Sequence, residues 1–99
     1  MKNRDKTEIN TVKERETVSE GAEYRYELIM KRSKRVASYR LPLYSVRVSM
    51  TDKDGKETYA ELNDIFSDIG KAIVFFNRIA DNLATPIDLP YIFEDQILV

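Results

Sequence analysis

The amino-acid sequence predicts one α+β domain, an antiparallel β-meander of three to four strands followed by two helices packed on one face of the sheet. Three observations lead to this fold class. Residues 23–31 and 39–51 alternate apolar and polar side chains, as half-buried strands do. An Asp-Gly pair at 54–55 marks a hairpin. Residues 68–83 then repeat apolar side chains at helical spacing.

The first twenty residues are charged and short of apolar side chains, which is typical of a mobile arm. Their segment TVKERETVS contains enough β-branched residues to form an edge strand instead. The sequence leaves both alternatives open for residues 1–20. It assigns residues 21–99 to a single α+β domain, as expected for a chain of 99 residues.

Two strands are predicted before the hairpin. The apolar face of residues 23–31 consists of Tyr24, Tyr26, Leu28 and Met30. The charged run KRSKR, which begins at Lys31, is predicted to be a loop. In residues 39–51 the apolar side chains change from odd to even positions at Leu43-Tyr44, beside Pro42. Since a one-residue slip moves every side chain to the other face, a bulge or a strand start is expected there.

The hairpin and the first helix follow from local signals. Asp54-Gly55 is predicted to join strands over 43–51 and 57–63, because glycine accepts the positive φ of a tight turn. Ser67 or Asp64 is expected to cap the next helix. The apolar stripe of that helix consists of Ile69, Ala72, Ile73, Phe76, Ile79, Ala80 and Leu83.

A last short helix is predicted to begin near Asp88 and to run through Leu98. Its apolar face consists of Leu89, Ile92, Phe93 and Ile97. This helix must pack against the rest of the domain, so it is one candidate to cover apolar residues that the sheet does not bury.

Val74 and Phe75 are such residues, because Val74 lies almost opposite the stripe and Phe75 lies at its border. Together with Arg78 they form the predicted interface of a homodimer. The C-terminal helix or another protein partner could cover them instead. Small size and the absence of cysteine favour association as a source of additional buried area.

Basic residues are concentrated in segment 25–47, and acidic residues are in excess after residue 57. Tyrosines flank the basic residues, and this combination is typical of single-stranded nucleic-acid binding. A solvated loop is the alternative, since the tyrosines also fit a core face. The candidate nucleic-acid residues are Lys31, Arg32, Lys34, Arg35, Arg40 and Arg47.

Catalysis is not expected. The chain has no histidine and no cysteine, so the usual general base near neutral pH and the thiolate nucleophile are missing. No phosphate-binding glycine motif occurs, and the DKDG segment at 52–55 stops short of a calcium loop. We therefore predict no catalytic residue, no cofactor and no metal ligand. No apolar run suits a signal peptide or a membrane span, so a cytoplasmic protein without a membrane partner is expected.

The segment from residue 44 onward resembles a group of short, uncharacterised proteins from Firmicutes that share a domain of unknown function. The residues that carry the resemblance are YSVRV, then DIFSD before a helix with an aromatic pair, then PIDLPYIFEDQI. The resemblance covers roughly residues 44–98. It implies a bacterial, cytoplasmic protein and brings no activity and no catalytic residues with it.

Overall fold

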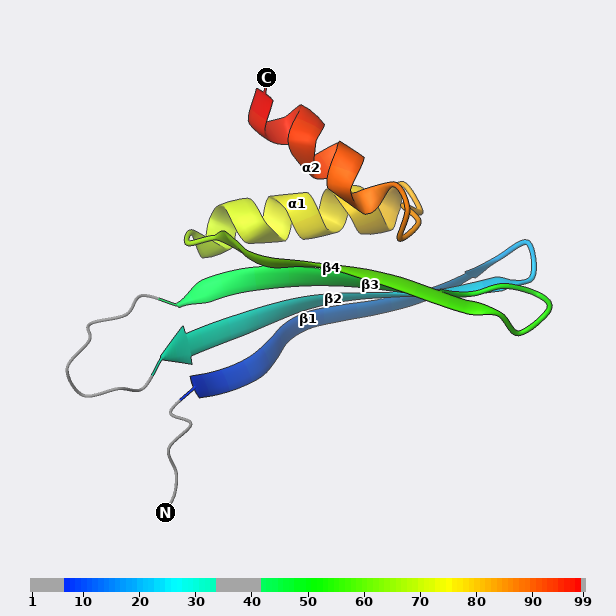
Figure 1. The fold of residues 1–99 in the computed structure, drawn as a ribbon, viewed down its shortest axis with the longest axis horizontal. Helices are drawn as coiled ribbons and strands as arrows, with labels where there is room; N and C mark the ends of the chain where they lie inside the picture. The colour runs from blue at the N-terminus through cyan, green and yellow to red at the C-terminus, as the bar shows by residue number, and fades with distance from the viewer. Residues whose placement is uncertain (1–6, 34–41, 99) are drawn as a thin grey trace, which may run out of the picture.

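Residues 7–33 and 42–98 are described by the computed structural model (Figure 1). Its elements are β1 (Thr7–Ser19), β2 (Ala22–Ser33), β3 (Leu43–Thr51), β4 (Glu57–Phe66), α1 (Ile69–Asp81) and α2 (Leu89–Leu98). The strands pair antiparallel in the order β1-β2-β3-β4. Both helices lie on the same side of the sheet in Figure 1. The predicted α+β meander is confirmed, with four strands.

β1 forms one edge of the sheet, which is one of the two alternatives for the N-terminal residues. A two-residue turn at Glu20 and Gly21, with φ of 51° and 80°, joins it to β2. The sequence predicts a strand over 23–31 followed by a loop, and the loop is wrong for Arg32 and Ser33, which belong to β2. Those residues continue β2 because the start of β1 supplies backbone partners, including the pair Thr7 and Ser33.

The β3–β4 hairpin has the predicted turn and nearly the predicted bounds. β3 begins at Leu43, so the change in apolar positions marks a strand start. Gly55 has a φ of 84°, and its N–H donates to the Asp52 carbonyl at 2.9 Å. The Asp52 side chain also accepts hydrogen bonds from the N–H groups of Asp54 and Lys56, each at 2.9 Å. This carboxylate therefore fixes the turn from inside the loop.

An irregular bulge interrupts β4 near its end. Tyr44 pairs with Phe66 and Val46 with Leu62, so β4 has two more residues than β3 between these pairs. Asp64 lies in the bulge with a φ of 55°, a conformation that aspartate tolerates better than most residues. Its N–H donates to the buried Ser45 hydroxyl at 2.9 Å, which replaces the lost ladder bond.

Asp68 is the N-cap of α1, so the predicted caps Ser67 and Asp64 are wrong. The Asp68 backbone is extended, and its side chain accepts a hydrogen bond from the Lys71 N–H at 3.1 Å. The bulge holds Asp64 within β4, too early to cap the helix. The helix consequently begins at Ile69.

The predicted stripe of α1 faces the sheet over its middle part. The core contains Tyr26, Leu28, Val46, Val48, Ala72, Phe76, Ile79 and Ala80. The two ends of the stripe differ from the prediction. Ile69 is 46% exposed, and Leu83 lies beyond the end of the helix with a φ of 53°. Burial is therefore greatest where α1 crosses the central strands.

Three phenylalanines join β4, α1 and α2, and we call them the aromatic cluster. Phe66, Phe75 and Phe93 have ring centroids 5.6–5.9 Å apart. The rings of Phe66 and Phe93 meet edge to face at 88°, an arrangement that aromatic pairs favour. Phe75 is fully buried, so the C-terminal helix and β4 cover it within one chain.

Candidate functional site

The face of the sheet opposite the helices, called the open face below, is the main candidate for a binding surface. No helix or strand in residues 7–33 and 42–98 covers it (Figure 1). Strand alternation places most of the charged strand residues on this face. They are Glu14, Glu16, Glu23, Arg25, Glu27, Lys31, Arg47, Glu57 and Glu61. Among these residues carboxylates outnumber cations, so the described part of the open face is acidic.

Arg47 is at the centre of an ion-pair ladder that crosses the sheet. It lies opposite Glu27 on β2 and opposite Glu61 on β4. Its guanidinium approaches the Glu61 carboxylate at 3.0 Å and the Glu27 carboxylate at 3.5 Å. The hydrogen bond with Glu61 raises the pKa of Arg47 above its usual value, so the guanidinium stays charged at any physiological pH.

The ladder continues on both sides of Arg47. Arg25 pairs with Glu14 on β1 and lies 3.9 Å from Glu27. On the other side, the Lys31 ammonium lies 3.4 Å from Glu61 and donates to the Asn63 side chain at 2.8 Å. Glu27 and Glu61 are only 13% and 15% exposed at their side chains. The negative charges of these two carboxylates are consequently stabilised by the neighbouring cations more than by water.

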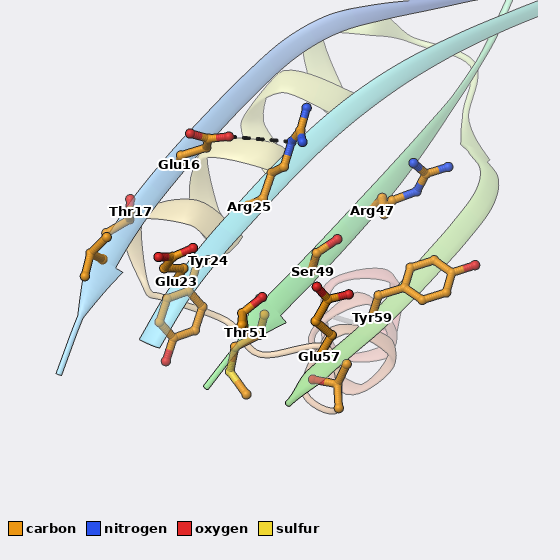
Figure 2. Close-up of a pocket in the computed structure, with 13 residues that line it drawn as sticks. Glu16, Thr17, Glu23, Tyr24, Arg25, Arg47, Ser49, Thr51, Glu57 and Tyr59 are labelled. Atoms are coloured by element: carbon orange, nitrogen blue, oxygen red, sulfur yellow. Dashed lines mark ion pairs between the residues drawn. The ribbon is translucent and has the colours of Figure 1, made fainter. Parts of the chain in front are cut away.

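A broad depression of about 1080 Å³ lies at the hairpin end of the sheet. Figure 2 shows that its lining comes from all four strands, with Arg25, Arg47, Ser49 and Tyr59 on neighbouring strands. Tyr59 is 65% exposed, and the Arg47 guanidinium lies 6.0 Å from its ring centroid. The depression is open and its lining is more polar than apolar, whereas small-molecule sites are usually enclosed and apolar. It suits contact with a macromolecular surface better than enclosure of a small ligand.

Two of the predicted nucleic-acid residues are engaged with carboxylates. Lys31 and Arg47 both pair with Glu61, and phosphate contact would require these pairs to break. Arg32 lies near the end of β2 and is exposed, opposite Glu8. The other predicted residues lie outside the described part of the chain, and they are Lys34, Arg35 and Arg40. The described residues therefore do not form the continuous cationic surface that the sequence suggests.

The three residues of the predicted interface do not share one surface. Val74 is 63% exposed on the outer side of α1, whereas Phe75 is fully buried in the aromatic cluster and unavailable to a partner. The physical reason is that α2 crosses near α1 and places Phe93 against Phe75. Arg78 is exposed and donates a hydrogen bond to Gln96 of α2 at 3.3 Å.

Tyr26 is a buried titratable group whose pKa is strongly raised. Burial raises the pKa of Tyr26 to about 12, with a further contribution from Tyr24, while Arg15 acts in the opposite direction. Its hydroxyl donates to the Ala84 carbonyl at 2.9 Å and ties β2 to the segment between the helices. The group is structural, because it is fully buried and its proton is committed to a backbone carbonyl.

Within residues 7–33 and 42–98, acidic side chains do not gather in groups of three that could hold a metal ion. Neither α1 nor α2 has the length and apolar character that crossing a bilayer requires.

The ion pairs of Glu27 and Glu61 are not among the features predicted from the sequence. The predicted hairpin could have indicated the pair of Arg47 with Glu61. In an antiparallel hairpin whose turn places Thr51 opposite Glu57, Arg47 lies opposite Glu61. Counting basic residues along the chain does not reveal these neighbours across the sheet.

A family model described as "Family of unknown function (DUF6514)" matches residues 5–99. Comparisons with curated proteins and with solved structures find no match.

Proposed function

The chain belongs to the DUF6514 family, whose function is unknown, and we propose that it acts by binding, as a homodimer and without catalysis. The predicted resemblance to a domain-of-unknown-function family is thereby confirmed, and the match extends over nearly the whole chain. A bacterial, cytoplasmic setting is part of the proposal. Since the family supplies no activity, the proposal depends on the surfaces of the molecule.

The observation that carries the binding proposal is the open face. Side chains from four strands are held there in fixed positions by ion pairs, with Arg47 between Glu27 and Glu61. Preorganised polar groups lose little conformational freedom when a partner binds. An acidic face of this kind favours a partner with complementary basic groups, because opposite potentials increase the rate of encounter and fix orientation.

Catalysis has less support from the same residues. A catalytic group must reach its substrate and have a pKa suited to proton transfer or attack. Tyr26 is buried, and the hydrogen bond of Arg47 increases its already high pKa. The whole chain also lacks histidine and cysteine.

Homodimer formation through the outer side of α1 is disfavoured by charge. A two-fold axis through Val74 would bring Lys71 of one copy beside the partner's Arg78, since both flank Val74 on the outer surface of the helix. With Phe75 buried, only Val74 would remain at the centre of this seam. The homodimer proposed here therefore uses another surface.

The test is sedimentation equilibrium of the full chain between about 1 and 100 μM, combined with fluorescence polarisation of labelled single-stranded oligonucleotides at low salt. We expect a dimer and no oligonucleotide binding. A monomer at every concentration would contradict the homodimer. Oligonucleotide binding with a steep salt dependence would favour the nucleic-acid alternative through segment 25–47.

A further inference from the structure

We propose that β4 is the dimer seam and that the outer edge of Glu57–Leu62 pairs antiparallel with the same segment of a second copy. This inference rests on the proposed homodimer and names its surface. The sheet has two edge strands, β1 and β4, whose outer backbone groups have no strand partner in the described part of the chain. Such edges are templates for strand addition unless the sequence protects them.

β1 carries two of the usual protections. A bulge interrupts its pairing with β2 between Thr11 and Lys13. Lys13 and Arg15 then point to the helix side of the sheet. The Lys13 ammonium lies 5.9 Å from the centroid of the Phe76 ring, and Arg15 pairs with Asp81 of α1. An added strand would have to pack against these inward-pointing charges, which is unfavourable.

The charge pattern of β1 also opposes pairing with a second β1. In an antiparallel two-fold pair centred on Glu14, Glu14 would face itself and Lys13 would face Arg15 of the other copy. Centring the pair on Arg15 sets Arg15 against itself and Glu14 against Glu16. Like charges directly opposite each other destabilise a strand pair, so both central registers of β1 are disfavoured.

β4 has no such pattern over Glu57–Leu62. An antiparallel two-fold pair centred on Ala60 sets Tyr59 against the partner's Glu61 and Thr58 against the partner's Leu62. No like charges lie directly opposite each other in this register. The residues on the helix side of the sheet here are Thr58, Ala60 and Leu62, all uncharged and only partly buried. A second β4 would cover them further.

The surroundings of β4 leave this segment accessible and define its limit. The bulge around Asp64 ends regular strand geometry after Leu62. The contact of β4 with the aromatic cluster comes from Phe66, which lies beyond the bulge. Figure 1 shows that the β3–β4 hairpin extends past the ends of both helices. The two-fold pair would form an eight-stranded sheet with both sets of helices on one side.

The open faces of the two copies would then be continuous across the seam. The ladder ends at Glu61 on β4, and the partner's Glu61 would lie diagonal to it across the seam, about 7–8 Å away. The binding surface proposed above would double in area without a change in character. A partner with basic groups could span both copies.

The test is a charge exchange at Tyr59, which is exposed and pairs with the partner's Glu61 in the proposed register. Tyr59→Glu creates two like-charge pairs, one on each side of the axis, and should weaken dimerisation about tenfold or more. Tyr59→Lys creates two opposite-charge pairs and should preserve the dimer. Val18→Glu is the matched control, because Val18 is a similarly exposed residue at the outer edge strand β1.

Each variant is studied by sedimentation equilibrium, with circular dichroism to verify folding. Amide hydrogen exchange of the wild type at low and high concentration supplies a second measurement. We expect concentration-dependent protection in 57–62 and none in 7–19. If the wild type dimerises but Tyr59→Glu has no effect and 57–62 gains no protection, the seam is overturned while the homodimer stands. A monomeric wild type overturns both.

Discussion

Replacing Phe75 with alanine tests whether the aromatic cluster fastens the C-terminal helix to the domain. Phe75 is fully buried and contacts the rings of Phe66 at 5.6 Å and Phe93 at 5.7 Å. Truncation of a buried phenylalanine costs about 3–5 kcal/mol. Because two ring pairs are lost as well, each worth about 0.5–1.5 kcal/mol beyond burial, we expect a value near the upper end of that range.

The assay is urea unfolding followed by circular dichroism at one fixed protein concentration, since association would add to the apparent stability. A domain of this size holds only about 5–15 kcal/mol in total, so Phe75→Ala should unfold at much lower urea. Val74→Ala is the neighbouring control. Val74 is 63% exposed, and its truncation should change the free energy of unfolding by about 0.5 kcal/mol or less.

A double-mutant cycle separates the cluster from simple burial. Phe75→Ala and Phe93→Ala should couple by about 0.5–1.5 kcal/mol, because each variant already removes their shared ring contact. Equal small losses for Phe75→Ala and Val74→Ala would refute the placement of Phe75. Strict additivity with Phe93→Ala would refute the ring contact alone.

Three further changes test separate contacts. Tyr26→Phe should cost about 1–3 kcal/mol at pH 7, because the Ala84 carbonyl loses its buried donor. The pKa of Tyr26 is about 12 in the folded protein and about 10 in the unfolded chain. Unfolding at a pH between these two values therefore releases a proton. Wild-type stability should then fall by roughly 2–3 kcal/mol relative to the variant as pH rises through this window, and parallel pH profiles would contradict this. Asp68→Ala should cost about 1 kcal/mol in thermal or urea unfolding through loss of the N-cap, and an unchanged midpoint would contradict that role. Ser45→Ala should cost about 1–3 kcal/mol and speed amide exchange at Asp64, whose N–H loses its acceptor, whereas unchanged exchange would show that another group satisfies it.

The sequence determines the strand and helix pattern well because the signals are local. The Asp54-Gly55 turn fixes the β3–β4 pairing, and strand alternation identifies which side of β2 and β3 is buried. The bulge at Asp64 has no comparable signal. It is stabilised by tertiary contacts, including the hydrogen bond to the hydroxyl of Ser45 on the neighbouring strand. Because Asp64 lies in the bulge, the helix is capped by Asp68 and not by Asp64 as predicted.

The candidate surfaces are less predictable, since they depend on residues far apart in the chain. A helical wheel describes the position of Phe75 relative to the sheet only. In the structure Phe75 also contacts Phe93 of the second helix. Likewise, the sequence around Arg47 contains no neighbouring carboxylate, but in the structure Arg47 forms ion pairs across the sheet with Glu27 and Glu61. The exposure of Phe75 and the free charge of Arg47 were predicted wrongly for the same reason. Both depend on residues that are close in the folded protein but distant in the sequence.

The order β1-β2-β3-β4 has a kinetic consequence. Every strand pairs with its neighbour in the chain, so the sheet can form by successive hairpin closures without waiting for distant segments to meet. Within the described residues, the contacts of greatest sequence separation join β1 and β2 to the helical part of the chain, such as Arg15 with Asp81 and Tyr26 with Ala84. We expect them to form last, so substitutions there should mainly accelerate unfolding, and those at the Asp54-Gly55 turn should mainly slow folding.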